Sequence, residues 1–362
     1  MTDLHSPASR RRVGTARRAT GAATRSPAAV PGGLTAAHRR ARDLLARGRS
    51  VVVVGHVHPD ADALGSALAL GMALRARGVR VQVAFAEPAT VPESLRELPG
   101  LELVVPVTAV DHRPELLVTV DVGSAERLGS LRTLLDTARQ SLVIDHHASN
   151  TRFGDHHLVD PAAEATVVLI ARLIDDLDVP LDAAIAANLY AGLATDTVAF
   201  RYAEARTHQL AARLVAAGAR PAEVLRPILD THPFGWLDML SRVLGNAVLD
   251  PGVGHGVGLV YATIDQVTSA GLRQEELDSV IDLLRTAAEA QVAAVLKQTG
   301  PQTWQVSLRA REVRGNGVDV AAVAGALGGG GHVRAAGFTH TGSPGRAVEL
   351  IVAELDRTTA SG

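Results

Sequence analysis

Short apolar runs alternate with longer Ala- and Leu-rich segments after Arg49, and this alternation limits the possible folds more than any other feature. The short runs suit buried strands and cover 51–54, 79–85, 116–120 and 142–144. The longer segments suit helices and cover 61–77, 165–177, 182–193 and 208–217. Strands joined by crossover helices form parallel sheets. The sequence therefore predicts an α/β fold, with helices on both faces of an N-terminal parallel sheet.

A second, smaller α/β domain is predicted downstream. Residues 221–249 have a helical pattern, and a new strand pattern begins at 255–264. The first 30 residues contain six arginines against one acid and cannot bury a core alone. We predict a disordered Arg/Ala-rich tail, a first domain, a helical connector and a second domain, at 1–36, 37–220, 221–249 and 250–358.

Composition narrows the chemistry that this chain can perform. The absence of cysteine excludes thiolate-bound metals and thiol nucleophiles, so a metal would need His, Asp or Glu ligands. The formal net charge of -2 provides no basic field for long duplex nucleic acid. No apolar stretch reaches the roughly 18 residues of a transmembrane helix. We therefore expect a cytoplasmic protein that contacts neither membranes nor long duplexes.

Three predicted strands run directly into acidic or histidine residues. The segment 51–54 leads into GHVHPDADALGS, 116–120 leads into a single aspartate, and 142–144 leads into Asp-His-His. A further aspartate follows an apolar helix in LYAGLATDT. Because the carboxyl ends of parallel strands share one edge of a sheet, these side chains should converge. They are His56, Asp60, Asp62, Asp121, Asp145, His146, His147 and Asp196.

Carboxylates that converge in a partly buried cleft repel one another unless cations neutralise them. A lone aspartate after a strand is more often a helix cap than a ligand. The joint occurrence of these segments, however, favours a metal site. Oxygen and imidazole ligands suit Mn²⁺ or Mg²⁺, and the histidines favour manganese. Four aspartates would balance about two divalent ions, which are the predicted cofactors.

From Ser50 to its end, the chain resembles the DHH family of phosphoesterases. The first family motif is matched by His56, Pro59, Asp60 and Asp62. The other three motifs are matched by VTVDVGSAERLG, VIDHHASN and GLATDT. The resemblance implies that the predicted first domain is the DHH catalytic domain.

The resemblance also implies a role for each side chain. The two metal positions would share Asp121, with His56, Asp60 and Asp121 in one position and Asp62, Asp121, His146 and Asp196 in the other. Asp145 would orient a histidine, and His147 would face the attacked phosphate or the leaving oxygen. The predicted catalytic residues are thus His147, Asp145 and Asp121.

A second Asp-His-His triplet follows at Asp155, His156 and His157. It comes after Arg-Phe-Gly rather than after an apolar strand, so nothing places it at the sheet edge. We predict that this triplet lies in a surface loop.

The C-terminal segment GGGGHVRAAG resembles the DHHA1 domain, which in relatives clasps a nucleotide or terminal phosphate. Consecutive glycines let backbone N–H groups approach an anion, although a flexible linker would explain the glycines equally well. Arg309 in VSLRAR matches the strand arginine that accompanies this motif. The predicted substrate-binding residues are Arg309, Gly329, Gly330, Gly331 and His332.

The length and layout resemble the NrnA type of oligoribonuclease within this family. The resemblance implies a manganese-dependent phosphoester hydrolase that acts on short RNA or 3′-phosphoadenosine 5′-phosphate. Cyclic di-AMP and its linear dinucleotide are further candidate substrates. A hydroxide bridging two metals would attack in line, and the C-terminal domain would favour short molecules. Because helices of two-domain relatives often pair, a homodimer is a further expectation.

Three alternatives remain open. A RecJ-like single-strand exonuclease shares the catalytic domain, but that class is usually longer, and 3% aromatic residues offer little stacking surface. An inorganic pyrophosphatase shares the metal motifs but lacks the Gly-rich segment. A nucleotide-binding module without catalysis would be expected to have lost some of the metal ligands, and here all six are present.

Overall fold

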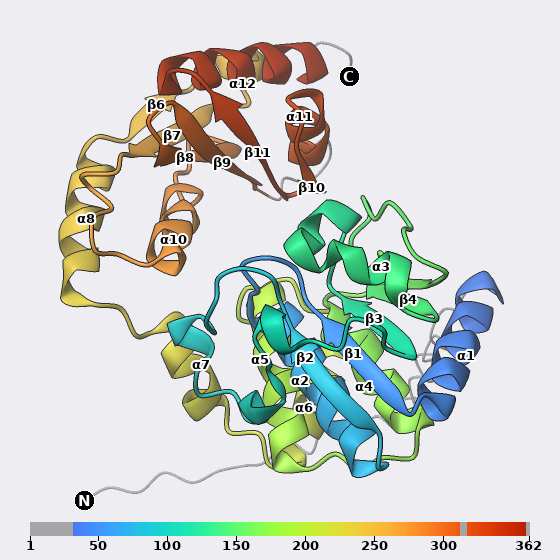
Figure 1. Cartoon of the computed structure of the whole chain (residues 1–362). Helices are drawn as coiled ribbons and strands as arrows, with labels where there is room; N and C mark the ends of the chain where they lie inside the picture. Colours follow the sequence, from blue (N-terminus) through green and yellow to red (C-terminus); the bar gives the residue numbers. More distant parts are fainter. Residues whose placement is uncertain (1–31, 312–316, 360–362) are drawn as a thin grey trace, which may run out of the picture.

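The structure is a computed structural model, and it describes residues 32–311 and 317–359. Two sheets with separate hydrophobic cores are joined by the helices α7 (Pro221–Leu229) and α8 (Phe234–Gly245) (Figure 1). No helix in these two ranges has the length and hydrophobicity needed to cross a membrane.

The first sheet consists of five parallel strands in the order β2-β1-β3-β4-β5. They are β1 (Ser50–Val54), β2 (Arg80–Ala84), β3 (Leu116–Val120), β4 (Ser141–Asp145) and β5 (His156–Val159). The near-continuous Val, Leu and Ile runs of β1, β3 and β4 are buried because both faces of the sheet are covered. The predicted parallel sheet is confirmed.

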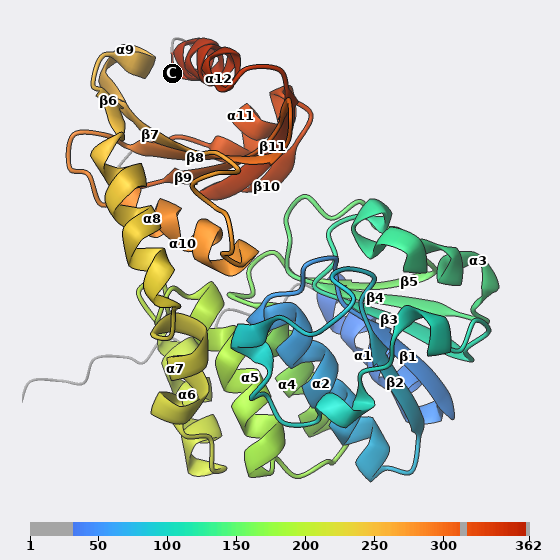
Figure 2. The same cartoon turned by 60° about the vertical axis from the view of Figure 1, so that its left-hand side comes forward.

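Different kinds of helix cover the two faces. One face packs against α1 (Gly32–Arg47), α2 (Ala61–Ala76), α4 (Thr166–Asp176) and α5 (Ala183–Asp196) (Figure 2). The other face packs against the 3-10 helix η4 (Ala125–Thr133) and the short α3 (Leu134–Thr137). The helix α2 is apolar on all sides because it lies between the sheet and the outer helices.

The start of the chain differs in part from the prediction. Residues 1–31 of the predicted tail lie outside the described residues, whereas 32–36 form the beginning of α1. This helix has an apolar stripe, Ala41, Leu44 and Leu45, that is buried in the first core. The stripe explains why ordered structure begins before residue 37.

Other short elements complete the first half and the connection. They are η1 (Glu93–Leu95), η2 (Leu101–Leu103), η3 (Val107–Ala109) and α6 (Ala205–Ala216). The predicted helical connector is two helices, α7 and α8, with a break that contains Pro233. Proline disfavours helical geometry in the preceding residue, which accounts for the break.

The second sheet has six strands in the order β10-β11-β9-β8-β7-β6, and only β7 and β8 are parallel. The strands are β6 (Val248–Asp250), β7 (Leu259–Ile264), β8 (Val292–Gly300), β9 (Thr303–Ala310), β10 (Gly330–His332) and β11 (Ala335–Thr341). The helices are α9 (Val253–Gly256), α10 (Gln274–Leu284), α11 (Val320–Ala326) and α12 (Pro344–Thr359). α8 and α10 pack on one face, while α9, α11 and α12 pack on the other.

One strand prediction begins too early in this second domain. The predicted strand at 255–264 starts at Leu259, because Gly254 and His255 have left-handed backbone angles in α9. Such angles do not fit the extended backbone of a regular strand. The β10–β11 end of the sheet is directed toward the first domain (Figures 1 and 2).

Candidate active site

The predicted site residues gather at the carboxyl ends of β1, β3 and β4. The strand order reverses between β1 and β3, and open α/β sheets bind ligands at such a reversal. His56 follows β1, Asp121 follows β3, and His146 follows β4. The sheet topology therefore brings together residues that are far apart in the sequence.

Asp121 lies at the centre of the cluster. Its Oδ2 is 3.5 Å from Nε2 of His56, and its Oδ1 is 3.6 Å from Nε2 of His146. The residue is buried and has a φ of 58°, a left-handed angle that aspartate tolerates better than most residues. Each carboxylate oxygen thus faces a different histidine, as a shared ligand would require.

His56 and Asp60 flank one side of Asp121. His56 Nδ1 lies 2.8 Å from the carbonyl oxygen of Val57, which leaves Nε2 directed at Asp60 Oδ2, 3.7 Å away. The other oxygen of Asp60 accepts the backbone N–H groups of Asp62 and Ala63, each at 3.0 Å. Asp60 is therefore the N-cap of α2 and can also present one oxygen to a metal.

His146 occupies the other side, between two further aspartates. Its Nε2 is 3.2 Å from Asp196 Oδ2 and 3.9 Å from Asp62 Oδ2. Its Nδ1 lies 3.2 Å from the carbonyl oxygen of Ala163, an outer contact that orients the ring. Asp196, at the end of α5, contacts His146 but does not belong to the compact groups centred on Asp121.

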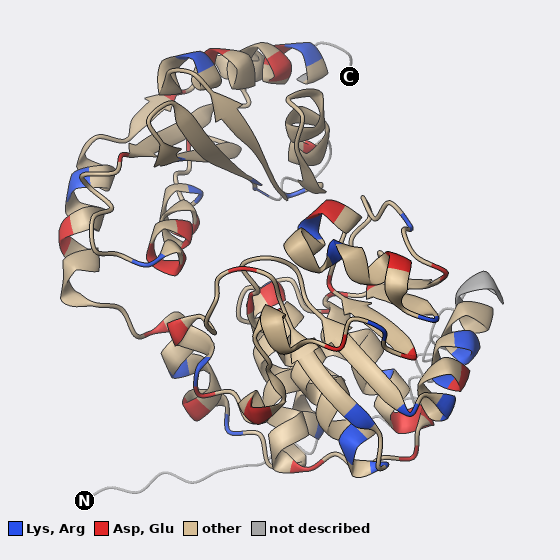
Figure 3. Ribbon diagram, in the orientation of Figure 1, with Lys and Arg blue, Asp and Glu red and all other residues tan. Residues whose placement is uncertain are grey.

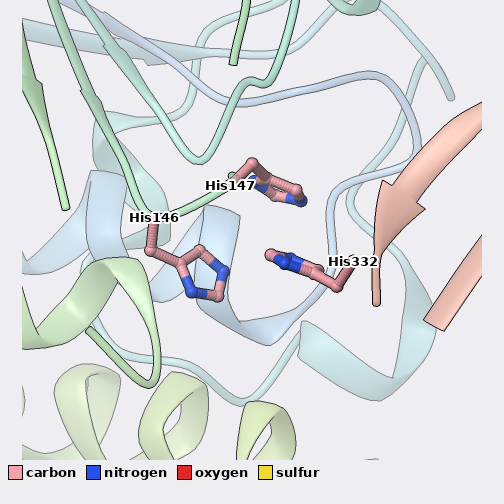
Figure 4. Close-up of side chains that lie close together, drawn as sticks. All are labelled: His146, His147 and His332. Atoms are coloured by element: carbon pink, nitrogen blue, oxygen red, sulfur yellow. The ribbon is translucent and has the colours of Figure 1, made fainter. Parts of the chain in front are cut away.

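His147 points into the space between the two domains. Its Nδ1 is 2.7 Å from Asp145 Oδ1, and Asp145 Oδ2 accepts a 2.6 Å hydrogen bond from Asn150. The ring of His332, from the second domain, stacks on His147 with centroids 4.5 Å apart and lies 5.0 Å from His146 (Figure 4). The three rings close one side of the site.

Burial and mutual charge determine how these groups titrate in the metal-free protein. Burial disfavours a charged His56, but hydrogen bonds to Asp121 and Asp60 raise its pKa to about 10. Burial likewise opposes charge on His146, yet Asp196 and the other carboxylates raise its pKa to about 11. Protons on the two histidines thus partly neutralise the carboxylates.

The pKa values of the carboxylates in the cluster are also shifted, because several acidic groups are buried close together. Burial, followed by the charges of Asp196 and Asp121, raises the pKa of Asp62 well above its usual value. Burial also raises the pKa of Asp196 to about 6, despite its contact with His146. Asp121 shifts the other way, because His56, His147 and His146 outweigh its burial and lower its pKa. Such opposed shifts are typical of a site that binds cations.

The side chains fit the predicted metals. One compact group contains His56, Asp60 and Asp121, and a second contains Asp62, Asp121 and His146, with ligand atoms within 4.8 Å in each group. Imidazole nitrogens and carboxylate oxygens suit Mn²⁺ or Mg²⁺. The arrangement can therefore hold metal ions at two positions that share Asp121.

Sequence patterns missed two residues that support this cluster. Thr166, at the start of α4, donates its hydroxyl to Asp121 Oδ1 at 3.0 Å and its backbone N–H to Asp62 at 2.6 Å. Asn150 holds Asp145, as described above. The hydrophobic periodicity of the chain carries no signal for either contact. For Asn150, its place in the segment VIDHHASN is the only hint.

The Gly-rich segment is more than a flexible loop. Gly330, Gly331 and His332 form β10, paired with β11. A Cβ atom on Gly329 or Gly331 would collide with the β11 backbone, so these glycines permit close strand pairing. Gly330 has open space around its Cα. From the sequence we expected these glycines to contact an anion, and their packing against β11 was missed.

A cavity of about 880 Å³ lies between the domains beside the cluster. Asp121 and His147 line one part of it, and 328–331 line another. Arg309 is half-buried on β9 between Ala293 and Ala335 and does not line this cavity. The structure thus brings the glycines and His332 to the site, whereas substrate binding by Arg309 stays a prediction.

Two residues of the second Asp-His-His triplet belong to the sheet rather than to a loop. His156 and His157 begin the edge strand β5, and Asp155 accepts hydrogen bonds from the backbone N–H and hydroxyl of Ser141. The surface-loop prediction was wrong for the two histidines, because a four-residue edge strand lacks the long apolar run of an interior strand. It holds for Asp155, which is exposed and precedes the strand. The triplet lies at the opposite end of its strand from the cluster.

Known proteins share both halves of this architecture. The model of the DHH family, N-terminal domain, matches residues 50–193, and that of the DHHA1 domain matches residues 256–361. The bifunctional oligoribonuclease and PAP phosphatase NrnA of Thermus thermophilus is 34% identical over 316 residues, which cover 85% of this chain and 90% of that protein. The cyclic-di-AMP phosphodiesterase GdpP of Geobacillus thermodenitrificans is 26% identical over 319 residues, covering 81% of this chain and 45% of GdpP.

A solved structure shows the same fold. An exopolyphosphatase-related protein from Bacteroides fragilis aligns with a TM-score of 0.78 at 19% identity, covering 90% of this chain and 97% of that chain. The motif order, the carboxylate–histidine cluster and the extent of the match to NrnA agree with one another. The chain therefore belongs to the DHH/DHHA1 family of phosphoesterases, which are hydrolases of phosphoester bonds.

Proposed function

We propose that this protein hydrolyses short oligoribonucleotides and 3′-phosphoadenosine 5′-phosphate in a manganese-dependent reaction. The observation that carries the proposal is the placement of Asp121, whose two oxygens face His56 and His146, on the wall of an interdomain cavity. The relative with 34% identity, NrnA, is named for these two activities. Manganese is the preferred ion, with magnesium as the alternative.

The metal cluster and His147 would act on different parts of the substrate. Two divalent ions at the shared cluster would polarise the phosphate and acidify a water molecule. Asp145 holds Nδ1 of His147, so Nε2 is directed toward the cavity, where it can donate a proton to the leaving oxygen. The pKa of His147 is raised: burial opposes its charge, but Asp145 and Asp121 outweigh that effect. The raised pKa favours the protonated form of His147, which a proton donor requires.

The size and the walls of the cavity favour short substrates. His332 from the second domain stacks on His147, and β10 and β11 form the opposite wall. A volume of about 880 Å³ suits a nucleotide or a dinucleotide rather than a long strand. Blue and red segments are interspersed over both domains in the described part of the chain (Figure 3), which does not favour a long basic track.

We also propose further substrates and a homodimer, each on weaker support than the two main substrates. Cyclic di-AMP and its linear dinucleotide are supported by the similarity to GdpP, a cyclic-di-AMP phosphodiesterase. A homodimer is supported by the exposed apolar stripe Phe234, Leu237 and Leu244 on α8. A RecJ-like exonuclease and a nucleotide-binding module without catalysis are the alternatives, and a cytoplasmic location stays a prediction.

A manganese-supplemented activity panel tests this proposal. It compares 3′-phosphoadenosine 5′-phosphate, RNAs of two to five nucleotides, a 20-nucleotide RNA, cyclic di-AMP and pyrophosphate. We expect the bisphosphate and the shortest RNAs to be cleaved with the highest kcat/KM. Equal values for the dinucleotide and the 20-nucleotide RNA would favour the RecJ-like alternative, and binding without turnover would favour the non-catalytic one.

A further inference from the structure

One arginine on the wall of the interdomain cavity was not singled out by the motifs. Among the described residues that line this cavity, Arg127 is the one lysine or arginine. It lies in η4 and is exposed. The cavity also contains Asp121 and His147, so the guanidinium of Arg127 shares a compartment with the candidate metal centre.

Arg127 has no partner within the described parts of the chain that would neutralise its charge. The neighbouring Glu126 also lines the cavity, but it forms its ion pair, at 3.8 Å, with Arg132. No side-chain hydrogen bond or ion pair involves the Arg127 guanidinium within those ranges. An exposed arginine that faces a cavity without a carboxylate partner is suited to bind an anion.

The backbone at Arg127 is fixed to the metal-centre loop. Its carbonyl oxygen accepts a 2.8 Å hydrogen bond from the N–H of Val57, the residue that follows His56. A Cβ atom at Gly129 would lie 2.9 Å from Cγ1 of Val57 and 2.8 Å from Cβ of Ala86, so η4 packs tightly against this loop. The backbone at Arg127 therefore keeps a constant position relative to the cluster.

Arg127 is not part of the cluster itself. Its side chain makes no ion pair with any carboxylate of the cluster in the described chain. The guanidinium therefore shares the cavity wall with Asp121 and His147 without neutralising a carboxylate of the cluster.

We propose that Arg127 binds a second phosphate of the substrate, one that is not hydrolysed. This inference rests on the proposed function. Its ligand class is a nucleotide with two separate phosphate groups, such as a 5′-phosphorylated dinucleotide or a nucleoside 3′,5′-bisphosphate. The planar guanidinium can hold two oxygens of such a group at once, which makes Arg127 a specificity residue.

The test compares the dinucleotides pApA and ApA, which differ by the 5′-phosphate. For Arg127→Ala we expect KM for pApA to rise roughly ten- to hundredfold, the range for a charge-assisted hydrogen bond, with kcat and the values for ApA nearly unchanged. Arg127→Lys should recover part of the loss. Arg132→Ala is the matched control, because Arg132 is on the same helix but pairs with Glu126 and does not line the cavity.

Equilibrium binding separates this proposal from the proposed function. Calorimetry with pApA and ApA would use Asp121→Asn protein, with and without Arg127→Ala. A preference for pApA that disappears with Arg127→Ala supports the second-phosphate site, even if the wild-type protein cleaves neither dinucleotide. Equal losses of affinity for pApA and ApA would overturn the second-phosphate site. So would kinetics in which Arg127→Ala lowers only kcat. Failure of the wild-type protein to hydrolyse any short RNA would instead count against the proposed function.

Discussion

Asp145 and Asp155 occupy the same position in two identical triplets, yet they do different work. Asp145 connects Asn150 to Nδ1 of His147, whereas Asp155 bonds Ser141 away from the cluster. The motif alone cannot distinguish the roles of the two aspartates, because both triplets read Asp-His-His. The residues before each triplet do distinguish them, since an apolar strand places only the first triplet at the sheet edge that binds ligands.

The triplets provide a matched pair of substitutions. Asp145→Asn removes the charge that orients His147 and raises its pKa, so we expect kcat to fall about 10- to 100-fold, as is usual for a supporting partner. Steady-state kinetics on a short RNA measure the effect. Asp155→Asn should leave kcat within about twofold. Equal losses in the two variants would show that position 145 acts through stability rather than through His147.

The two ligand histidines should lose protons when metal binds. His56 and His146 have pKa values of about 10 and about 11 in the metal-free protein, so both carry a proton at pH 8. A metal ligand must be unprotonated, and the apparent affinity for manganese should therefore rise with pH up to these values. Calorimetry in two buffers of different ionisation enthalpy should detect proton release. Binding without release would contradict the assignment of these two side chains.

Sequence reasoning identified the residues of the cluster but missed Thr166 and Asn150, which support them. The candidate ligands follow apolar strands or an apolar helix, so periodicity places them at one edge of the sheet. Thr166 supports Asp62 and Asp121 across long stretches of sequence, and no local pattern encodes such contacts. Arg127 was missed for a similar reason, because the placement of the second domain makes it part of a cavity wall.

At the scale of elements, the contact between α2 and α5 positions two of the candidate ligands. Asp62 lies in the first turn of α2, and Asp196 ends α5. The helices approach closely at Gly65 and Gly192, where added side-chain atoms would meet backbone of the partner helix. Small residues at this crossing therefore fix the distance between the two carboxylates.

Substitution of Gly192 tests this dependence. A Cβ atom there would lie 2.8 Å from Asp62 Oδ1 and 2.8 Å from Cγ1 of Val167. We expect Gly192→Ala to reduce the free energy of unfolding by about 1–3 kcal/mol, as overpacking does, and to weaken manganese binding. Denaturant unfolding and metal titration provide the measurements. Gly245→Ala is the control, since a Cβ atom at the end of α8 meets nothing within 4 Å.

The predicted elements differ in how clearly the sequence marks them. Interior strands such as β1 and β3 have unbroken Val and Leu runs, because both faces are covered. β10 and β11 lie in a Gly- and Ala-rich segment that also suits a linker, and their pairing depends on close backbone approach. The edge strand β5 is short and begins with two histidines. Tertiary contacts, rather than local sequence, decide these elements.

At the scale of the whole molecule, ring contacts and charged side chains hold the second domain over the first. His332 lies against the rings of His146 and His147. Arg273 pairs with Glu93 at 3.2 Å, and Arg334 lies 5.9 Å from the centre of the Tyr202 ring. The contacts are polar or small, and exposed ion pairs contribute little to stability. The sequence predicted two domains joined by a connector, but it could not give their relative placement, which creates the cavity.

The central claim is that Asp121 joins two metal positions on the wall of that cavity. The most direct test is the initial rate of dinucleotide hydrolysis with manganese, in the wild-type protein and in Asp121→Asn. Since loss of an outer-shell partner alone costs 10- to 100-fold in other metal sites, loss of the shared ligand should reduce the rate by more than about 100-fold. The far-UV circular dichroism of the variant should stay unchanged. An unchanged rate in folded Asp121→Asn protein would contradict the account.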